Sequence, residues 1–302
     1  MQTHPDQQNR LEIRRVEMPH RSKLAVRFIV APILCCLVYF VIIAMAVETS
    51  YTFWGPEYRQ HDGFIYLTEG LIGIVVLSIW LFIKKKAVLP GPEFSVGQQE
   101  DWVLAVVAAL AMLGISTLYF ILVTKLHTRF IQQSLHDYET MMEIPVQSKA
   151  ETAMGFIATC ILIPILEEFI FRGCALAGML EVGHPVISIV VSGLFFGAMH
   201  GQVIQIGYAA IAGIILGLVY YLSNNIIMPI VAHMIFNFIG SGIEMIWHLP
   251  DQASYILSII EFASIAVFLG LAAIMWLRRK ERFPEKKEEI GNINNMLPGR
   301  HT

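Results

Sequence analysis

Long apolar runs, separated by short polar segments, are the main pattern in this sequence. Each run is about 20 residues long, the length that an α-helix needs to cross ~30 Å of hydrocarbon. Buried strands would be shorter and bounded by turn residues. The pattern therefore predicts an all-α fold, a polytopic transmembrane helix bundle. About eight spans are expected, at residues 26–47, 64–83, 102–124, 152–177, 185–203, 204–222, 226–247 and 254–277.

One segment has a different pattern, because its apolar and polar residues alternate with helical spacing. Over residues 126–142 this spacing predicts one amphipathic helix that lies in the membrane interface and covers the bundle. We expect a structural rather than a catalytic role for it. Its apolar face contains Leu126, Phe130, Ile131, Leu135, Tyr138 and Met142.

The composition also indicates a membrane protein. Hydrophobic residues make up 56% of the chain and charged residues only 15%, with a mean hydropathy of +0.61. A soluble domain of this length would need more charge on its surface. The lipid bilayer is therefore an expected partner, and a net charge of −3 argues against a nucleic-acid partner.

Basic residues gather beside three of the apolar runs. Because cytoplasmic loops of membrane proteins carry an excess of Lys and Arg, this bias predicts a multi-pass cell-membrane protein with both termini in the cytoplasm. An even number of crossings agrees with that placement. The basic residues are Arg10, Arg14, Arg15, Arg21, Lys23, Lys84, Lys85, Lys86, Arg278, Arg279 and Lys280.

These patterns divide the chain into five parts. A cytoplasmic N-terminal tail (1–25) precedes the N-terminal transmembrane helices and the amphipathic helix (26–147). A membrane core (148–247) is followed by the last transmembrane helix (248–282). The remaining polar tail (283–302) is expected to be disordered.

Two adjacent acids are the most unusual residues in the apolar runs. Glu167 and Glu168 lie in the fourth run, just after Pro164. Each ionised side chain at mid-bilayer costs ~2.5–3.5 kcal/mol on the insertion scale, so intramembrane acids indicate function. Pro164 has no N–H to bond the carbonyl of Cys160, and a kink or local loosening of the helix is expected there.

The spacing gives the two acids different roles. Neighbouring residues on a helix point ~100° apart, so Glu167 and Glu168 cannot share one direction. Arg172 follows Glu168 by one helical turn and faces it. We therefore expect Arg172 to neutralise and orient Glu168, which leaves Glu167 available as a general base or acid.

Two later apolar runs supply further polar side chains. His200 ends a run, and His233 and Asn237 lie one turn apart on one face of another. Taken singly, each has a structural explanation: an intramembrane His can be a packing residue, a Glu–Arg pair a clamp, and an Asn a contact between helices. All three sets in one half of the chain favour a catalytic site.

Together the three motifs resemble those of the CPBP family of CAAX proteases and bacteriocin-processing enzymes, also called the Abi family. It includes the type II CAAX prenyl endopeptidases. The motifs are Glu-Glu-x-x-x-Arg, Phe-x-x-x-His and His-x-x-x-Asn, in the family's order, within about 150–240. The resemblance implies an intramembrane peptidase whose catalytic membrane core is residues 148–247.

The resemblance also implies a role for each motif residue. Glu167 activates the attacking water, supported by the Glu–Arg pair beside it. His233 and Asn237 stabilise the oxyanion, and His200 positions the water or the leaving group. Amide hydrolysis needs such a base, such donors and an acid for the amine. The six candidate catalytic residues are Glu167, Glu168, Arg172, His200, His233 and Asn237.

The sequence leaves a metal cofactor open. Glu167, His200 and His233 could hold a divalent ion such as zinc, with water in the fourth position. The chain has no His-Glu-x-x-His signature, and both metal-dependent and metal-independent mechanisms have been described for the family. The residues slightly favour a metal-independent site.

One conflict concerns the depth of His200. His233 and Glu167 are expected about two to three turns from the cytoplasmic ends of their spans, whereas His200 lies near the outer end of the fifth run. The three side chains can meet only if that run enters the membrane later than residue 185 or continues beyond Gly201. Only Gly201 and Gln202 separate it from the sixth run, so we expect an error of several residues in these boundaries.

Three functions fit these features to different degrees. An intramembrane endopeptidase acting on a membrane-associated, prenylated or leader-peptide substrate uses the whole motif set. A non-catalytic membrane scaffold or a bacteriocin self-immunity protein is the alternative, although a scaffold has little need of buried acids. A transporter or proton relay would require an internal repeat, and the first three runs contain no counterpart of the motifs.

Overall fold

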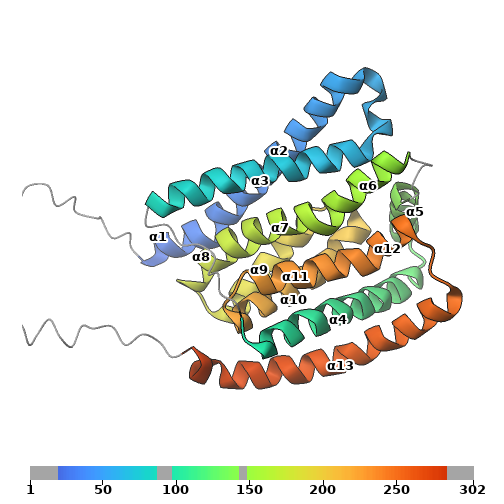
Figure 1. Ribbon diagram of the computed structural model, residues 1–302. Helices are drawn as coiled ribbons and strands as arrows, with labels where there is room; N and C mark the ends of the chain where they lie inside the picture. The colour runs from blue at the N-terminus through green and yellow to red at the C-terminus, as the bar shows by residue number, and fades with distance from the viewer. Residues whose placement is uncertain (1–19, 87–96, 143–147, 284–302) are drawn as a thin grey trace, which may run out of the picture.

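A computed structural model describes residues 20–86, 97–142 and 148–283 (Figure 1). These residues form helices joined by short connections, and they contain no strand. Seven of the helical segments in this part of the chain are long and apolar enough to cross a membrane. The expected all-α, polytopic bundle is therefore confirmed.

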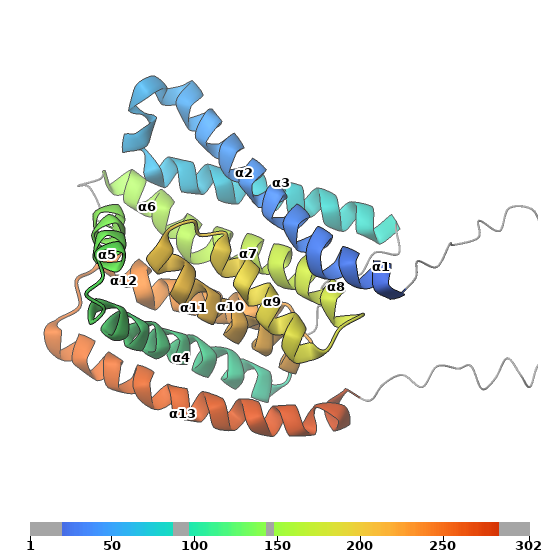
Figure 2. The same ribbon diagram turned by 180° about the vertical axis from the view of Figure 1, so that it is seen from behind.

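The N-terminal helices form a hairpin on one side of the bundle (Figures 1 and 2). The first residue of its turn is a glycine with a φ of 58°, a conformation that residues with a Cβ rarely adopt. The hairpin contains α1 (His20–Ala25), η2 (Val26–Val30), α2 (Ala31–Trp54), η3 (Gly55–Gln60) and α3 (Asp62–Lys86).

A long irregular rod crosses the middle of the bundle. Its junction residues keep right-handed helical φ and ψ angles, so the helix continues through changes in its hydrogen-bond pattern. The rod contains α6 (Lys149–Ile157), η4 (Ala158–Leu162), α7 (Ile163–Glu168), η5 (Phe169–Leu176) and α8 (Ala177–Leu180).

Two antiparallel helices and a second irregular rod pack beside it. Glycines let α9 and α10 approach closely, because a Cβ on Gly193 would lie 2.5 Å from Cγ1 of Ile214. These elements are α9 (Pro185–Ala198), α10 (Val203–Ser223), α11 (Ile227–Asn237), η6 (Phe238–Gly242) and α12 (Ile243–Ile246).

Two long helices, α4 (Gln99–Thr124) and α13 (Asp251–Arg282), lie side by side on the far side from the hairpin (Figures 1 and 2). α4 is close to its neighbours because its inward face carries small, fully buried residues such as Ala105 and Ala108. Side chains of α10, α11 and α13 complete the largest core cluster, including Leu216.

The fifth expected span is shorter than predicted, which corrects the count of full-length spans. α9 ends at Ala198, and α10 begins at Val203 after a turn in which Gly201 has a φ of 70°. A helix of 14 residues is about 21 Å long, less than the ~30 Å core. α9 therefore reaches only part of the way across. It neither begins later than residue 185 nor continues beyond Gly201, so both expected alternatives are wrong, and the short helix removes the conflict over the depth of His200.

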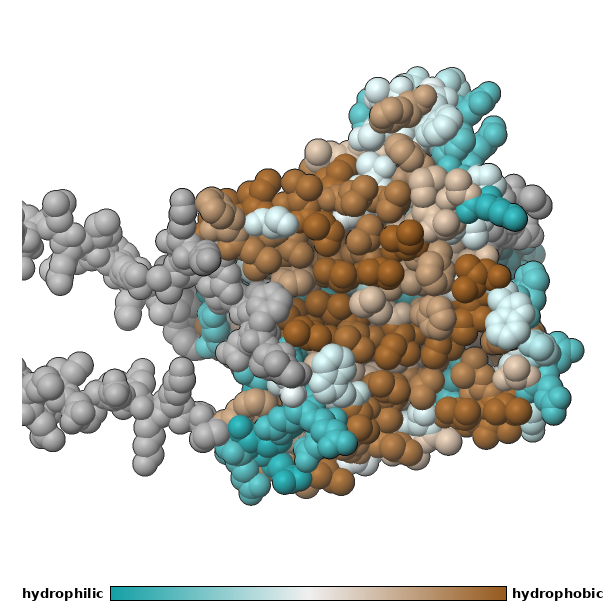
Figure 3. Space-filling view, in the orientation of Figure 1, coloured by the Kyte–Doolittle hydropathy of each residue, from teal (hydrophilic) through white to brown (hydrophobic). Residues whose placement is uncertain are grey.

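The outer surface is apolar along the middle of the bundle, and its polar residues gather toward the ends (Figure 3). On the N-terminal hairpin, Leu37, Val41, Val75 and Ile79 are all more than half exposed. Monomeric soluble proteins rarely expose apolar patches of this extent, whereas lipid is the natural solvent for them. With the seven apolar helices, this surface makes the chain a multi-pass membrane protein.

The predicted amphipathic helix is present as α5 (Arg129–Met142), and it lies across the ends of its neighbours (Figures 1 and 2). Leu135 joins a buried cluster with Val123 and Ile204. Phe130, by contrast, is 64% exposed. Such an exposed apolar residue beside a docked face suits a membrane interface, and the position of α5 in that interface stays a prediction.

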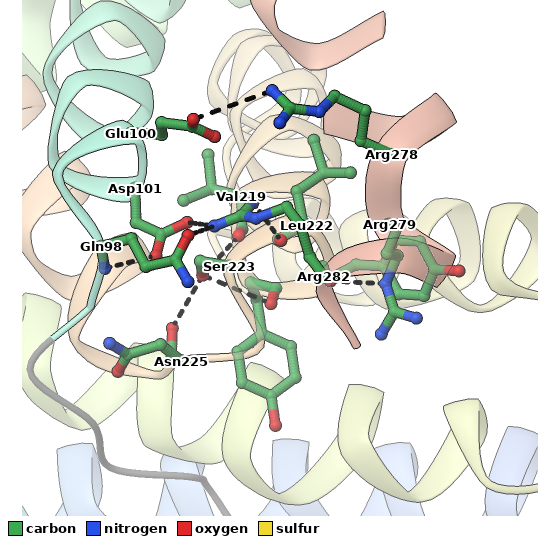
Figure 4. Close-up of polar contacts among 12 residues, drawn as sticks. Gln98, Glu100, Asp101, Val219, Leu222, Ser223, Asn225, Arg278, Arg279 and Arg282 are labelled. Carbon is green, nitrogen blue, oxygen red and sulfur yellow. Dashed lines mark hydrogen bonds and ion pairs between the residues drawn. The ribbon is translucent and has the colours of Figure 1, made fainter. Parts of the chain in front are cut away.

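A buried ion pair lies at the N-terminal end of α4 (Figure 4). Nη2 of Arg282 lies 2.7 Å from Oδ1 of Asp101, and the two side chains are only 8% and 3% exposed. Arg282 also donates to the Leu222 carbonyl at 3.3 Å, and Arg279 donates to the Tyr221 carbonyl at 3.0 Å. These contacts fasten α13 to both α4 and α10.

We expect Asp101→Ala to lower the free energy of unfolding by about 3 kcal/mol, because removing one partner leaves a buried charge uncompensated. Unfolding in mixed micelles measures the change. Glu100→Ala is the matched control: its pair with Arg278 spans 3.8 Å and is about half exposed, so little change is expected. Equal stability of the two variants would contradict the prediction.

Candidate active site

Pro164 changes the hydrogen bonding of the central rod just before the two acids. In the π-helical turn η4, the Ile163 N–H bonds the Ala158 carbonyl. Because Pro164 has no N–H, neither residue supplies a backbone donor to the Thr159 carbonyl. Asn237 supplies one instead, with Nδ2 at 2.8 Å from that oxygen. The loosening expected at Pro164 is confirmed, and it joins α11 to the rod.

A second π-helical stretch, η5, begins directly after Glu168. Such wide turns are rare and often occur at functional sites. Only Cys174 of its eight residues is not buried. The acids therefore lie between two irregular turns in the interior of the bundle, where a regular helix would point the same side chains elsewhere.

Glu168 is anchored from two sides. Nη1 of Arg172 donates to its Oε1 at 2.9 Å, and both side chains are fully buried. Nδ1 of His233 lies 2.9 Å from the same oxygen. Arg172 in turn donates to the Gly213 carbonyl at 2.9 Å, and its guanidinium carbon lies 4.6 Å from the centre of the Phe196 ring. The expected pairing of Arg172 with Glu168 is confirmed.

Glu167 points away from that pair, as expected. Its Oε1 accepts a hydrogen bond from the Tyr39 hydroxyl at 2.6 Å, and its Oε2 lies 3.7 Å from Nε2 of His233. The imidazole of His233 therefore lies between the two acids, with one ring nitrogen facing each. Since a carboxylate only accepts hydrogen bonds, the contact with Glu168 places a hydrogen on Nδ1 of His233.

His200 lies near this group without a direct hydrogen bond to it among the described residues. Its ring centre is 5.1 Å from that of Phe196, which is 5.8 Å from that of His233. Nδ1 of His200 contacts the Phe196 carbonyl at 2.9 Å. A carbonyl only accepts, so this nitrogen carries a hydrogen, and in the neutral ring Nε2 is the acceptor. The ring is half-buried.

The structure thus brings the predicted residues to one place. Glu168 contacts both Arg172 and His233, and His233 also lies beside Glu167. His200 and Asn237 lie nearby, each bonded to a backbone carbonyl. Residues 149–239 match the family model described as Type II CAAX prenyl endopeptidase Rce1-like. We call residues 149–239, which are similar to this family, the Rce1-like core. No curated protein and no solved structure gives a significant match.

The match to the Rce1-like family begins with α6 and ends just after Asn237. It covers all six candidate residues and confirms the resemblance read from the motifs. The family is one of proteases, which supports a peptidase in the membrane. The helices α2, α3, α4 and α13 lie outside the match.

Two buried polar residues from outside the Rce1-like core were missed by the sequence analysis. Tyr39 is 6% exposed and contacts Glu167 directly. Glu69 is 5% exposed and interacts with both Tyr39 and Glu167. Glu69 carried a usable signal, since it is an acid within an apolar run. Tyr39 carried none, because tyrosines are common in membrane helices.

The side chains are not arranged as a metal site. Among the described residues, no three His, Cys, Asp or Glu side chains are placed to hold an ion. Both ring nitrogens of His233 face carboxylate oxygens. Nδ1 of His200 contacts the Phe196 carbonyl, and no hydrogen bond or ion pair joins His200 to Glu167 in the described part of the chain. The ligand set considered above, Glu167, His200 and His233, therefore does not fit zinc in this arrangement.

Proposed function

We propose that this protein is an intramembrane endopeptidase that hydrolyses a peptide bond with water activated by Glu167. The contrast between the two acids carries the proposal. Glu168 is occupied by Arg172 and His233, whereas Glu167 has no ion pair with Arg or Lys among the described residues. A buried carboxylate that is not paired with Arg or Lys is suited to accept a proton from water.

In the proposed reaction, Glu167 takes a proton from water as the oxygen attacks the carbonyl carbon. The oxyanion that forms needs donors. Asn237 uses one amide hydrogen on Thr159 and has a second to offer, and His233 lies within the same group. Collapse of the intermediate breaks the C–N bond as the proton passes to the amine. His200 is assigned to position the water or the leaving group through Nε2.

The expected substrate is a peptide or protein held in or at the membrane, because the acids lie within apolar helices. A prenylated CAAX end is the first candidate, since the core resembles enzymes of that name. Leader peptides and membrane-spanning regulators are the others. In this proposal side chains supply the base, the donors and the acid, and the reaction needs no metal.

We further propose that both ends of the described chain face the cytoplasm. The start of α1 and the end of α13 lie at the same end of the bundle (Figures 1 and 2). Arg278, Arg279 and Lys280 lie at that end, and basic residues favour the cytoplasmic side.

Comparative proteomics of membranes tests the function and finds the substrate. Cells that carry Glu167→Ala should accumulate an uncut precursor that wild-type cells process, at equal levels of the two proteins. Glu261→Ala is the matched control, because Glu261 is a comparably buried acid on α13. Normal processing in the Glu167→Ala cells would reject the peptidase. A partner retained by every motif variant would instead indicate a membrane scaffold.

A further inference from the structure

The N-terminal hairpin packs directly on the rod that carries the two acids. Two glycines of α3 make this contact possible: a Cβ on Gly70 would lie 2.6 Å from the Cβ of Leu162, and one on Gly73 would overlap Leu166. Only glycines fit at such a close approach. Leu166 directly precedes Glu167, so α3 is fixed against the catalytic segment itself.

This contact carries two polar side chains from outside the Rce1-like core into the site. Tyr39 comes from α2, and its ring lies edge-on to Phe171 with centres 6.5 Å apart. Glu69 precedes Gly70 on α3 and is 5% exposed. The Tyr39 hydroxyl donates its one hydrogen to Oε1 of Glu167 at 2.6 Å, and Glu69 lies close enough to interact with the same Tyr39 side chain.

A purely structural contact would not need these residues. Helices packed through glycines in a membrane are held by close contact, and a Phe with a Leu would fill the same space. Burying an acid beside a second acid is unfavourable. Here the buried Glu69 interacts with Glu167, to which the Tyr39 hydroxyl is hydrogen-bonded, so the arrangement costs stability at the position of the proposed base.

The geometry indicates a function for the Tyr39–Glu167 hydrogen bond. The hydroxyl of Tyr39 occupies one oxygen of Glu167, which leaves Oε2 as the oxygen on the side of His233. A carboxylate on a flexible side chain must be held within a fraction of an ångström to act efficiently as a base, and a supporting shell of hydrogen bonds does this.

We propose that Tyr39, itself oriented by Glu69, is a positioning residue that holds Glu167 with Oε2 toward the substrate. The N-terminal hairpin therefore completes the site, although it lies outside the family match. This inference rests on the proposed peptidase function. The inference goes beyond the proposed function because it assigns part of the catalytic arrangement to α2 and α3.

Kinetics of single and double variants test the proposal, with a peptide that spans the cut site of the precursor found in Glu167→Ala membranes as the probe. Tyr39→Phe removes only the hydroxyl. It should lower kcat by roughly ten- to a hundredfold, the scale of effect expected for a slightly misplaced group, with KM nearly unchanged because Tyr39 does not touch the substrate. Glu69→Leu should lower kcat in the same way, by less.

The double variant separates positioning from packing. If Glu69 acts through Tyr39, Glu69→Leu has no further effect on kcat once the Tyr39 hydroxyl is removed, so the two losses do not add. Tyr119→Phe and Glu261→Leu are the matched controls. The first removes a hydroxyl that donates to the Ile204 carbonyl, and the second removes a buried acid elsewhere in the bundle. Both should keep the kcat of the wild-type protein.

Wild-type kcat in Tyr39→Phe, or a change in KM alone, overturns the positioning role. Additive losses in the double variant overturn the link between Glu69 and Tyr39. If Tyr39→Phe is not recovered folded, a wild-type kcat in Glu69→Leu is enough to reject the arrangement. An active Glu167→Gln variant would reject the peptidase mechanism itself. If Glu167→Gln is inactive and Tyr39→Phe is fully active, only the positioning role of Tyr39 is rejected.

Discussion

Glu167→Gln should lower kcat by about a hundred- to ten-thousandfold, the range that a general base contributes, and should leave the protein folded. Glutamine keeps the length and shape of the side chain. Its amide oxygen can still accept the hydrogen bond that the Tyr39 hydroxyl gives to Oε1. It loses only the ability to take a proton. The variant therefore tests proton transfer by Glu167 without changing the position of the side chain.

The fold should tolerate this substitution because Glu167 is not part of the buried ion pair. Its contact with His233 spans 3.7 Å, whereas the contacts of Glu168 with Arg172 and His233 are both 2.9 Å. Removing the charge of an unpaired acid in an apolar site relieves a cost rather than creating one. The melting temperature in detergent should therefore be equal to that of the wild-type protein or higher.

Glu261→Gln is the control for the activity measurement. Glu261 is 7% exposed, against 5% for Glu167, and both lie in apolar helices. If both variants lose activity, the loss reflects buried acids in general and not the site. If Glu167→Gln cleaves the precursor at the wild-type rate, Glu167 is not the base and the proposed mechanism is wrong.

Much of this site could be predicted because the relevant signals are local. The cost of acids in lipid marks Glu167 and Glu168 in the sequence, and one-turn spacing pairs Glu168 with Arg172. The effect of Pro164 follows from its missing N–H. None of these inferences needs knowledge of which helices are neighbours, and the structure confirms the ion pair and the loosened helix at Pro164.

The features that were missed depend on contacts between distant segments. Tyr39 and Glu167 are bonded across two helices that the sequence does not pair, and the approach of α3 depends on glycines that could face any neighbour. The early end of α9 depends on the positive φ of Gly201, which the apolar run does not reveal. Hydropathy averages over such a turn, and the fifth span was therefore predicted too long.

Arg172→Met should destabilise the protein by about 3–5 kcal/mol, the usual result of removing one partner of a buried ion pair. Both side chains of the pair are fully buried. Methionine fills similar space but leaves the carboxylate of Glu168 with His233 as its only remaining partner within 4 Å among the described residues. Unfolding in mixed micelles measures the loss, and a stability equal to that of the wild-type protein would contradict it.

A second substitution shows whether the pair acts only as a clamp. In Glu168→Gln/Arg172→Met both charges are gone, so most of the lost stability should return, because well-packed neutral groups often replace a buried pair without penalty. The introduced glutamine can still accept from Nδ1 of His233, but a neutral amide orients and polarises the ring less strongly than a carboxylate. We therefore expect kcat to stay at least roughly tenfold below that of the wild-type protein, the effect of one weakened charge-assisted hydrogen bond. Recovery of stability together with full activity would make the pair a structural clamp and leave catalysis to Glu167 and its other neighbours.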